Sequence, residues 1–280
     1  MVHREVWVGD VCFSNAAPLA IIAGPCVIEG SGYAQGVEFA LKTAESLKKI
    51  CEKVGLPLVY KSSFDKANRT SIHSYRGPGL EVGLKILDQV KRELDLPVVT
   101  DVHEMSQVRE VVKVADLVQT PAFLCRQTDF IQAVAMAGKP VNIKKGQFLA
   151  PQDMLKVAQK ALQVGNESVM LCERGYAFGY GDLVVDMRGL MVMSETGFPV
   201  VFDATHSVQQ PGGLGNSSGG ERKFVAPLAR AAVAVGVSGV FLESHADPDN
   251  APCDGPNMVP FDQLPALLTT LKRLDEVRKG

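Results

Sequence analysis

The sequence has no apolar run of about 18 or more residues, so we expect no membrane-spanning helix among its 280 residues. Residues 1–5 lack the basic and apolar regions of a signal peptide, which makes a cytoplasmic protein the expectation. The chain also has no large excess of charge of one sign, because its formal net charge is −2. Neither nucleic acid nor a membrane is therefore an expected partner, and any anionic ligand must be held by local cations.

Closely spaced cysteines and linker-like segments are also missing. The six cysteines are scattered without a Cys-x-x-Cys pair, which is typical of small buried side chains with one or two in a functional role. No Pro/Ser-rich or low-complexity tract divides the sequence. We expect one domain over residues 1–280, with a small β-hairpin in about residues 1–15.

Short apolar runs alternate with longer amphipathic ones along the rest of the chain. Strands are predicted at 19–23, 58–61, 98–100, 117–119, 141–143, 169–172, 200–203 and 239–243. Helices are predicted in the intervals, for example at 36–54, 80–94, 106–114, 153–164, 224–235 and 263–277. About eight βα units favour an α/β fold of the (β/α)8 barrel (TIM barrel) type, and a doubly wound open sheet is the alternative. The glycine-rich segment 204–222 is predicted to be a mobile lid.

Polar residues gather just after the predicted strands, where a barrel carries its chemistry. The densest group is residues 61–71, KSSFDKANRTS, which follows the apolar run 56–60. Unpaired cations are costly to bury, whereas Arg and Lys bind phosphates and carboxylates well. An ordinary solvated loop is the alternative for this segment alone. The recurrence of such groups at successive strand ends predicts an enzyme.

Several cations would meet at one mouth of the barrel, and so two anionic groups or one multiply charged substrate are expected there. They are Lys61, Lys66, Arg69, Lys144, Lys145, Arg174 and Arg126. Neighbouring residues of a strand face opposite sides. Only one of Lys144 and Lys145 can therefore point inward. We predict that it is Lys144 and that the other is a surface lysine.

Four potential metal ligands follow strands one, seven and eight of the predicted barrel. Cys26, His206, Glu243 and Asp254 combine a thiolate, an imidazole and two carboxylates, a set that suits Zn2+, Fe2+ or Mn2+. Each has a structural alternative: Cys26 as a small residue packed under a Gly-Pro turn, and His206 as a histidine hydrogen-bonded near Asp203.

These motifs closely resemble the 3-deoxy-D-manno-octulosonate 8-phosphate synthases over almost the whole chain. The matching segments are 23–26 (AGPC), 61–76 (KSSFDKANRTSIHSYR), 100–104 (TDVHE), 119–127 (QTPAFLCRQ), 142–145 (NIKK), 172–175 (CERG), 202–209 (FDATHSVQ) and 242–256. The resemblance implies condensation of phosphoenolpyruvate with D-arabinose 5-phosphate and water, in lipopolysaccharide sugar biosynthesis. It also implies a homotetramer.

The resemblance assigns roles to individual side chains. The expected phosphoenolpyruvate ligands are Lys61, Ser63, Lys66, Gln119, Lys144 and Arg174. Asn68, Arg69 and Thr70 would hold arabinose 5-phosphate, with Arg69 and Thr70 on its phosphate, either in the same subunit or from a neighbour. Asp101 would position the sugar or a water. Lys144, Asn68, Asp101 and His206 are the expected catalytic residues.

The resemblance also bears on the metal. A Cys after Gly-Pro, here Cys26, is typical of the metal-dependent members, with His206, Glu243 and Asp254 as the other ligands. The segment Cys253-Asp254-Gly255-Pro256 instead resembles metal-independent members, which leaves the strictness of the metal requirement open.

Two other functions are compatible with the sequence. The related 3-deoxy-D-arabino-heptulosonate 7-phosphate synthases use erythrose 4-phosphate, but they usually carry Lys-Pro-Arg-Thr where this chain has Lys66-Ala67-Asn68-Arg69-Thr70. A silent barrel that only binds phosphosugars is the other alternative, and the intact Lys144, Arg174 and four ligands argue against it.

Overall fold

Eight parallel strands form a closed barrel in the structure, a computed structural model that describes residues 3–69, 71–212 and 219–280. The barrel strands are β3 (Ala20–Gly24), β4 (Leu58–Lys61), β5 (Val98–Asp101), β6 (Leu117–Thr120), β7 (Val141–Lys144), β8 (Val169–Glu173), β11 (Val200–Asp203) and β14 (Gly239–His245). Each pairs with the next in the order of the chain, and the last strand, β14, pairs with the first, β3, with Val240 opposite Ile21, to close the ring. The predicted (β/α)8 barrel is confirmed, and the open sheet is excluded by this closing pair.

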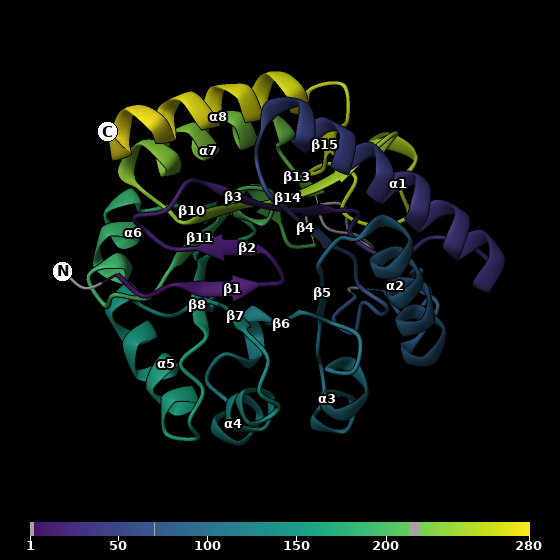
Figure 1. Ribbon diagram of the computed structural model, residues 1–280, viewed down its shortest axis with the longest axis horizontal. Coiled ribbons are helices and arrows are strands. Elements are labelled where there is room, and N and C mark those ends of the chain that lie inside the picture. The colour runs from purple at the N-terminus through teal and green to yellow at the C-terminus, as the bar shows by residue number, and fades with distance from the viewer. Residues whose placement is uncertain (1–2, 70, 213–218) are drawn as a thin grey trace.

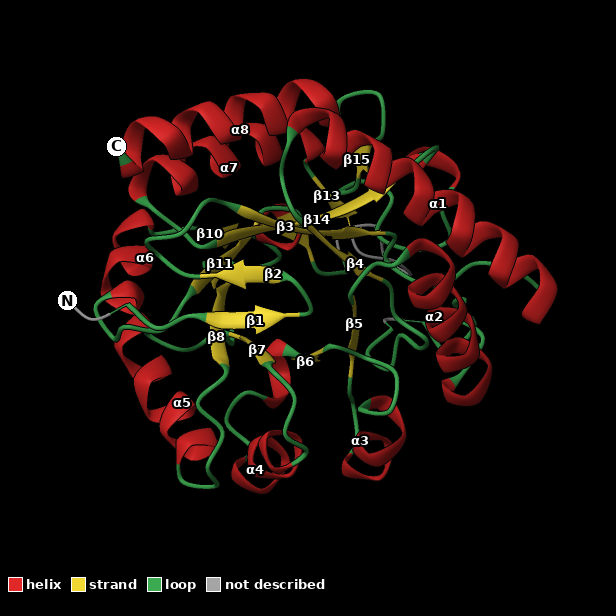
Figure 2. Cartoon of the chain, viewed as in Figure 1, coloured by secondary structure: helices red, strands yellow, loops and turns green. Residues whose placement is uncertain are grey.

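Helices surround the barrel, as Figures 1 and 2 show. They are α1 (Tyr33–Val54), α2 (Leu80–Leu94), α3 (Met105–Val111), α4 (Thr128–Met136), α5 (Met154–Leu162), α6 (Met187–Ser194), α7 (Val225–Val235) and α8 (Leu264–Lys279). Parallel strands require such crossovers, and helices on the outer face bury the second side of each strand. In the described part of the chain, no helix is long and apolar enough to cross a membrane.

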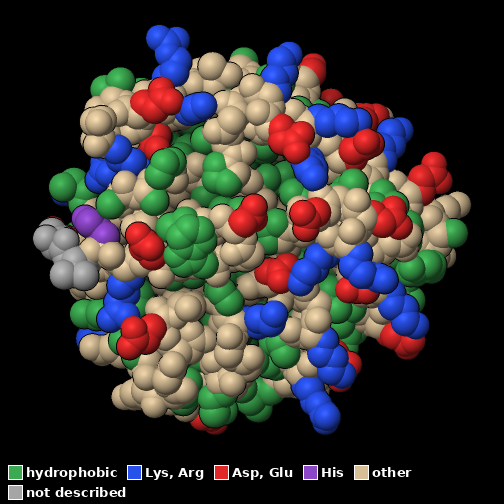
Figure 3. All heavy atoms as spheres, viewed as in Figure 1, with side chains coloured by type: hydrophobic (Ala, Val, Ile, Leu, Met, Phe, Trp, Pro, Cys, Tyr) green, Lys and Arg blue, Asp and Glu red, His purple; other side chains and the backbone are tan. Residues whose placement is uncertain are grey.

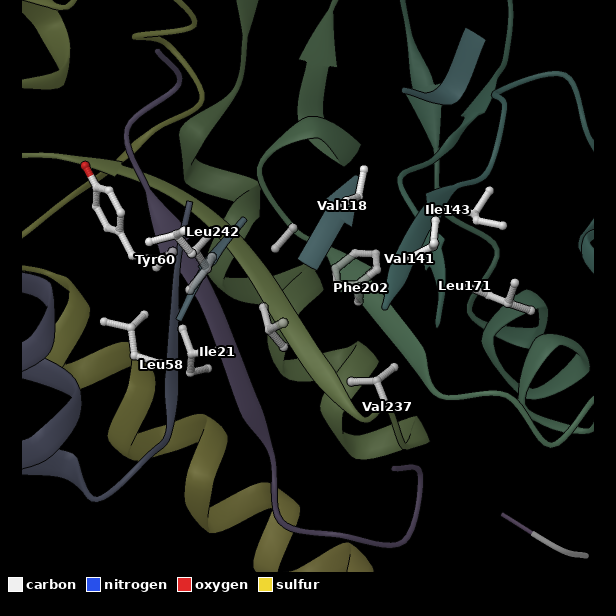
Figure 4. Packing of buried hydrophobic residues seen from close by; sticks show 14 of the residues in the cluster. Ile21, Leu58, Tyr60, Val118, Val141, Ile143, Leu171, Phe202, Val237 and Leu242 are labelled. Carbon is white, nitrogen blue, oxygen red and sulfur yellow. The ribbon is translucent and has the colours of Figure 1, made fainter. Parts of the chain in front are cut away.

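The alternation of side chains along each strand divides the core into two layers. Ile22 of β3 packs inside the barrel with Val59 and Phe241, whereas its neighbour Ile21 packs outward against the helices. Figure 4 shows part of this outer layer, including Ile21, Leu58, Val118 and Leu171. Because both faces of the strands are buried, most strand sequences are apolar until their carboxyl ends, and the buried Asn142 of β7 is an exception.

A hairpin covers one end of the barrel, as predicted. Its strands β1 (Val6–Val8) and β2 (Val11–Phe13) pair antiparallel and lie across the barrel in Figure 1. Val6, Val8, Val11 and Phe13 are buried with the inner layer of the barrel. On this face acidic and basic side chains are interspersed, as Figure 3 shows. The hairpin therefore closes the amino-terminal end of the barrel and leaves the other end for chemistry.

The predicted strands and helices agree with the observed ones to within a few residues, and β14 continues to His245 beyond its predicted end. Helices α4 and α6 were not among those named from the sequence. The segment 204–222 is less irregular than expected, because it forms the short pair β12 (Gln209–Gln210) and β13 (Gly219–Gly220). Residues 213–218 of the predicted lid lie outside the described residues.

Candidate active site

A cavity of about 370 Å³ lies at the carboxyl ends of the barrel strands. This volume is in the range of small-molecule sites, about 300–1,000 Å³. Its charged and amide side chains include Lys61, Lys66, Asn68, Arg69, Asp101, His103, Gln119, Lys144, Gln147, Arg174, His206, Gln209, Glu243 and Asp254. The sequence separation between them is large, and only the closure of the barrel brings them together.

Lys61 ends β4 and is almost completely buried beside Glu243 of β14. Its Nζ donates to Oε1 of Glu243 at 2.7 Å and to the carbonyl of Cys26 at 2.9 Å. A Cβ at Gly24 would collide with the carbonyl of Lys61, so glycine there allows β3 and β4 to approach closely. Lys66 lies 3.6 Å from the same Glu243 oxygen. Burial by itself would raise the pKa of Glu243, but Lys61, His206 and Lys66 lower it by more.

Asp101 ends β5 and accepts hydrogen bonds from Ser63 and from Nε2 of Gln119. Gln119 in turn accepts from Asn142 at 2.9 Å. Burial tends to raise the pKa of Asp101, but Lys61 and Lys66 overcome this effect and hold it well below its usual range. Asp101 is therefore a fixed negative charge in the cavity. The Ser63 hydroxyl donates to it and does not itself line the cavity.

Lys144 ends β7, and its ammonium points into the cavity. Nζ lies 2.7 Å from Oδ2 of Asp203 and 4.2 Å above the ring centre of Phe241. The same carboxylate oxygen lies 2.7 Å from Nδ1 of His206, and its partner oxygen accepts from the His206 amide at 2.9 Å. Asp203 thereby fixes a lysine and a histidine together. The predicted structural role of His206 beside Asp203 is thus present, alongside its place in the cavity.

Arg174 follows β8 and is almost completely buried at the cavity wall. One terminal nitrogen donates to Gln209 at 3.0 Å. The other, Nη1, is buried with no hydrogen-bond partner among the described residues. Gln209 also donates to Asp254 at 3.3 Å. An unpaired guanidinium nitrogen at the wall of a cavity is suited to an anionic ligand.

Two of the predicted cations lie elsewhere. The side chain of Lys145 is fully buried on the other side of the β7 end, so its expected surface position is wrong. The alternation that turns Lys144 inward was correct, but in a barrel the outward side is also covered. Arg126 is exposed and does not line the cavity.

The opposite wall comes from the loop after β4. Asn68 and Arg69 line the cavity from the same chain. Arg69 donates to the Pro252 carbonyl at 2.8 Å, to the Tyr75 carbonyl at 3.2 Å and to the Cys253 sulfur at 3.0 Å. Thr70, predicted to bind with them, lies outside the described residues.

Three of the four predicted metal ligands, His206, Glu243 and Asp254, form one group of possible donors, and Cys26 adjoins this group through Asp254. Nε2 of His206 is 3.6 Å from Oε1 of Glu243 and 3.9 Å from Oδ2 of Asp254, and that oxygen is 3.3 Å from the Cys26 sulfur. In addition, Oε2 of Glu243 is buried without a hydrogen bond among the described residues. Sulfur, imidazole and carboxylate donors at these separations fit a divalent transition metal.

Cys253 is a neighbour that the sequence did not single out as a ligand. The structure pairs it with Cys26 as a disulfide, with their Cα atoms 6.2 Å apart. A sulfur in a disulfide is not a thiolate, so Cys26 can act as a ligand only in the reduced pair. Cys253, Cys26 and Asp254 also form a second group of possible donors.

Most predicted site residues thus line one cavity, while Ser63 and Cys26 lie just behind it. Other residues of the wall include His103 and also Gln147 and Gln209, which were not assigned a role. Gln209 ends the motif 202–209, and His103 belongs to the motif 100–104, so position within those motifs was the available signal.

The chain is similar to known proteins over nearly its full length. The model of the DAHP synthetase I family matches residues 4–279. A "2-dehydro-3-deoxyphosphooctonate aldolase" of Magnetococcus marinus is 66% identical over 279 residues, which cover 100% of this chain and 95% of the relative. Proteins of the same name from Thioalkalivibrio sulfidiphilus (62% identical, 94% and 92% covered) and Geotalea daltonii (54% identical, 99% of both covered) also match. The chain therefore belongs to the DAHP synthetase I family and, within it, groups with the 2-dehydro-3-deoxyphosphooctonate aldolases.

Proposed function

We propose that the protein condenses phosphoenolpyruvate with D-arabinose 5-phosphate and water to give 3-deoxy-D-manno-octulosonate 8-phosphate and inorganic phosphate. This product and the phosphooctonate in the relatives' name are the same eight-carbon sugar acid phosphate in two nomenclatures. The name of the relatives and their identity of 54–66% over nearly the full chain support this activity over the seven-carbon alternative.

The observation that carries the proposal is the charge of the cavity. Among the described residues, five cationic side chains line it against three carboxylates, and Asp203 stands behind Lys144. Such a site needs anions to neutralise it, and the two substrates bring two phosphates and one carboxylate. Its cations come from different segments of the barrel, because Arg174 follows β8 and Arg69 lies in the loop after β4.

In this proposal, phosphoenolpyruvate occupies the part of the cavity between Lys61, Lys66, Lys144 and Arg174. The free Nη1 of Arg174 and the Lys144 ammonium are suited to its phosphate and carboxylate. Their fixed positions align the substrate before reaction, and their charge stabilises the negative charge that develops. Arabinose 5-phosphate then lies toward Asn68 and Arg69, with Arg69 on its phosphate.

The reaction joins C3 of phosphoenolpyruvate to the aldehyde carbon of the pentose. Water supplies a new oxygen at C2, and the bond between C2 and the phosphate oxygen breaks, so phosphate leaves with that oxygen. Asp101 stays ionised because of Lys61 and Lys66, and it is placed to orient a hydroxyl of the sugar or the water. His103 beside it has a lowered pKa, because burial outweighs the charge of Asp101.

We further propose that a divalent metal, Zn2+, Fe2+ or Mn2+, is held by Cys26, His206, Glu243 and Asp254. When bound it would act as a Lewis acid toward the aldehyde or a water. Asp203 would orient the His206 ring through Nδ1 and leave Nε2 for the metal. Lys61, which shares Glu243, competes for that carboxylate, and this offers a reason for a metal requirement that is less than strict.

The direct test of the activity is consumption of phosphoenolpyruvate and release of phosphate with and without arabinose 5-phosphate. The proposal predicts that the amount of phosphoenolpyruvate consumed equals the amount of phosphate released, and that both occur only when arabinose 5-phosphate is present. Binding of both substrates by calorimetry without phosphate release would instead support the silent barrel. A homotetramer in a cytoplasmic location stays a prediction, and light scattering on the purified protein tests the oligomeric state.

A further inference from the structure

Lys145 is a buried cation that the proposed reaction does not use. Its neighbour Lys144 ends β7 and enters the cavity, while Lys145 turns the other way and is fully buried. Its Nζ donates to the carbonyl of Gly146 at 3.1 Å and to that of Leu149 at 3.4 Å, both in the loop after β7. These contacts fix the ammonium to its own loop.

The same ammonium also reaches the turn that follows β8. It lies 3.5 Å from Oε1 of Glu173, 3.5 Å from the carbonyl of Gly175 and 3.6 Å from the ring centre of Tyr176. A second link between the two loops is the hydrogen bond of 3.0 Å from the Ala177 amide to the Gln147 carbonyl. Lys145 therefore joins the segments that carry three cavity residues, which are Lys144 at the end of β7, Gln147 in the loop after β7, and Arg174 after β8.

Glu173 connects Lys145 to the backbone of Arg174. Its Oε1 accepts the amide of Arg174 at 2.9 Å and that of Gly175 at 2.6 Å, so one carboxylate oxygen holds the turn from inside. Gly175 has a φ of +93°, which a residue with a side chain rarely adopts. This turn therefore sets the direction in which the Arg174 side chain leaves the backbone.

Stability alone gives no reason for such a pair. Burial lowers the pKa of Lys145 and raises that of Glu173, with each charge partly offsetting the shift of the other. A hydrophobic pair of similar volume is often as stable as a buried ion pair or more so. What a hydrophobic pair lacks is a donor for the loop carbonyls and a strong acceptor for the two amides of the turn.

We propose that Lys145 is a positioning residue, which acts through Glu173 to hold Arg174 in place for an anionic group of phosphoenolpyruvate. The inference rests on the proposed function for the identity of that ligand. Without Lys145, the Glu173 carboxylate is left buried and unpaired beside the turn, and the adjacent Arg174, whose charge already interacts with Glu173, can replace the lost partner. Arg174 is then drawn away from the cavity, while the arabinose 5-phosphate end at Asn68 and Arg69 is unaffected.

The test is steady-state kinetics on Lys145→Met and on the double variant Lys145→Met/Glu173→Gln. A displacement of about 1 Å can cost about 100-fold, so we expect the KM for phosphoenolpyruvate to rise about 10- to 100-fold in Lys145→Met. The KM for arabinose 5-phosphate should change less than about 3-fold. The double variant should recover most of the loss, because Gln keeps the acceptor and removes the unpaired charge.

A matched control is Lys279→Met, which removes the partly buried partner of the buried Asp275 at the other end of the barrel. Lys279 lies 2.6 Å from Asp275 and donates to the carbonyls of Ala17 and Val237. This variant should lose stability and keep both KM values. A purely structural role of Lys145 would give the same result, a smaller active fraction with unchanged KM, and that outcome overturns the inference.

If Lys145→Met does not fold, Gly175→Ala displaces the same turn without removing a charge. Its Cβ would meet Leu183 at 3.2 Å in addition to the strain at positive φ. Gly165→Ala is its control, with a φ of +85° and nothing within 4 Å of the new Cβ. We expect a raised KM for phosphoenolpyruvate in the first variant only, and equal KM values in both would refute the proposal.

If the wild-type protein does not turn over the two substrates, the proposed function fails. The inference is then tested by calorimetric titration with phosphoenolpyruvate alone. About 10-fold weaker binding by Lys145→Met, with Lys279→Met unchanged, supports it, and equal binding by all three proteins contradicts it.

Discussion

Asp203 is the most revealing single carboxylate in the cavity, because two functional side chains depend on one of its oxygens. It is fully buried, and its Oδ2 lies 2.7 Å from both Lys144 and His206. In Asp203→Asn, an amide oxygen can still accept from the His206 backbone. The amide NH2 would then face an ammonium and a ring nitrogen, and the buried Lys144 would lose its counter-charge.

The expected loss of stability is large. Removing one partner of a buried pair costs about 3–5 kcal/mol. For a domain of this size, about 1 kcal/mol corresponds to about 2 °C in Tm, so Tm should fall by about 6–10 °C. Phosphoenolpyruvate should restore part of this loss, because its anionic groups replace the carboxylate beside Lys144. At 100 times its Kd, a ligand that binds only the folded state adds about 2.7 kcal/mol.

Thermal unfolding with and without phosphoenolpyruvate measures both effects. The ligand should raise the Tm of Asp203→Asn by more than it raises that of the wild type. Asp275→Asn is the control, since Asp275 is also buried and paired with a lysine, Lys279, but lies far from the cavity. A ligand effect of equal size in all three proteins, or a Tm of Asp203→Asn within about 2 °C of the wild type, would refute this reasoning.

Three further changes test other parts of the site. With a thiol reductant present, Cys26→Ala should lose most activity and most bound metal. Cys26→Asn should keep partial activity that chelators do not affect. Near-normal turnover of metal-free Cys26→Ala would count against the ligand role. Asn68 is expected to form one or two hydrogen bonds to the pentose, so Asn68→Ala should raise the KM for arabinose 5-phosphate about 10-fold. The KM for phosphoenolpyruvate should stay unchanged. A change in the phosphoenolpyruvate KM instead would contradict the proposed placement of the two substrates. Asp101 has a lowered pKa, so its contribution to stability is present above about pH 4 and is lost as the pH falls. The difference in unfolding free energy between wild type and Asp101→Asn should therefore shrink by up to about 1.4 kcal/mol per pH unit below pH 4, and a constant difference would show that the shift is absent.

The fold was largely predictable, because each strand and each helix of a parallel barrel has its own local pattern in the sequence. Each strand is an apolar run ending in polar residues, as in the run that ends at Lys61, and each interval has helical periodicity. The ends shifted by a few residues because periodicity does not mark where a helix begins. Helices α4 and α6 lie in intervals between predicted strands for which no helix bounds were given.

The site was predictable in its residue types but not in its pairings. Strand-end position was enough to bring Lys61, Lys144 and Arg174 to one mouth. It could not show that Glu243 shares a hydrogen bond with Lys61, or that Ser63 faces Asp101 and not the cavity. Such contacts depend on the tilt and register of the closed barrel, which no local pattern contains.

Lys145 and Cys253 are two further residues whose surroundings could not be predicted from local sequence patterns. Strand alternation correctly separated Lys144 from Lys145, yet a lysine facing outward is normally assigned to the surface. The loop after β7 and the turn after β8 both contact the Lys145 ammonium, and the side chain is fully buried. Cys253 and Cys26 are 227 positions apart, and their contact arises because the loop after β14 returns over β3.

The central claim is that this site joins phosphoenolpyruvate to the five-carbon aldehyde. The most direct measurement is one reaction that contains phosphoenolpyruvate with equal amounts of arabinose 5-phosphate and erythrose 4-phosphate, followed by mass spectrometry of the products. The account predicts the eight-carbon sugar acid phosphate in large excess, formed in the same amount as the phosphate released. A predominance of the seven-carbon product would contradict it and assign the chain to the heptulosonate branch of its family.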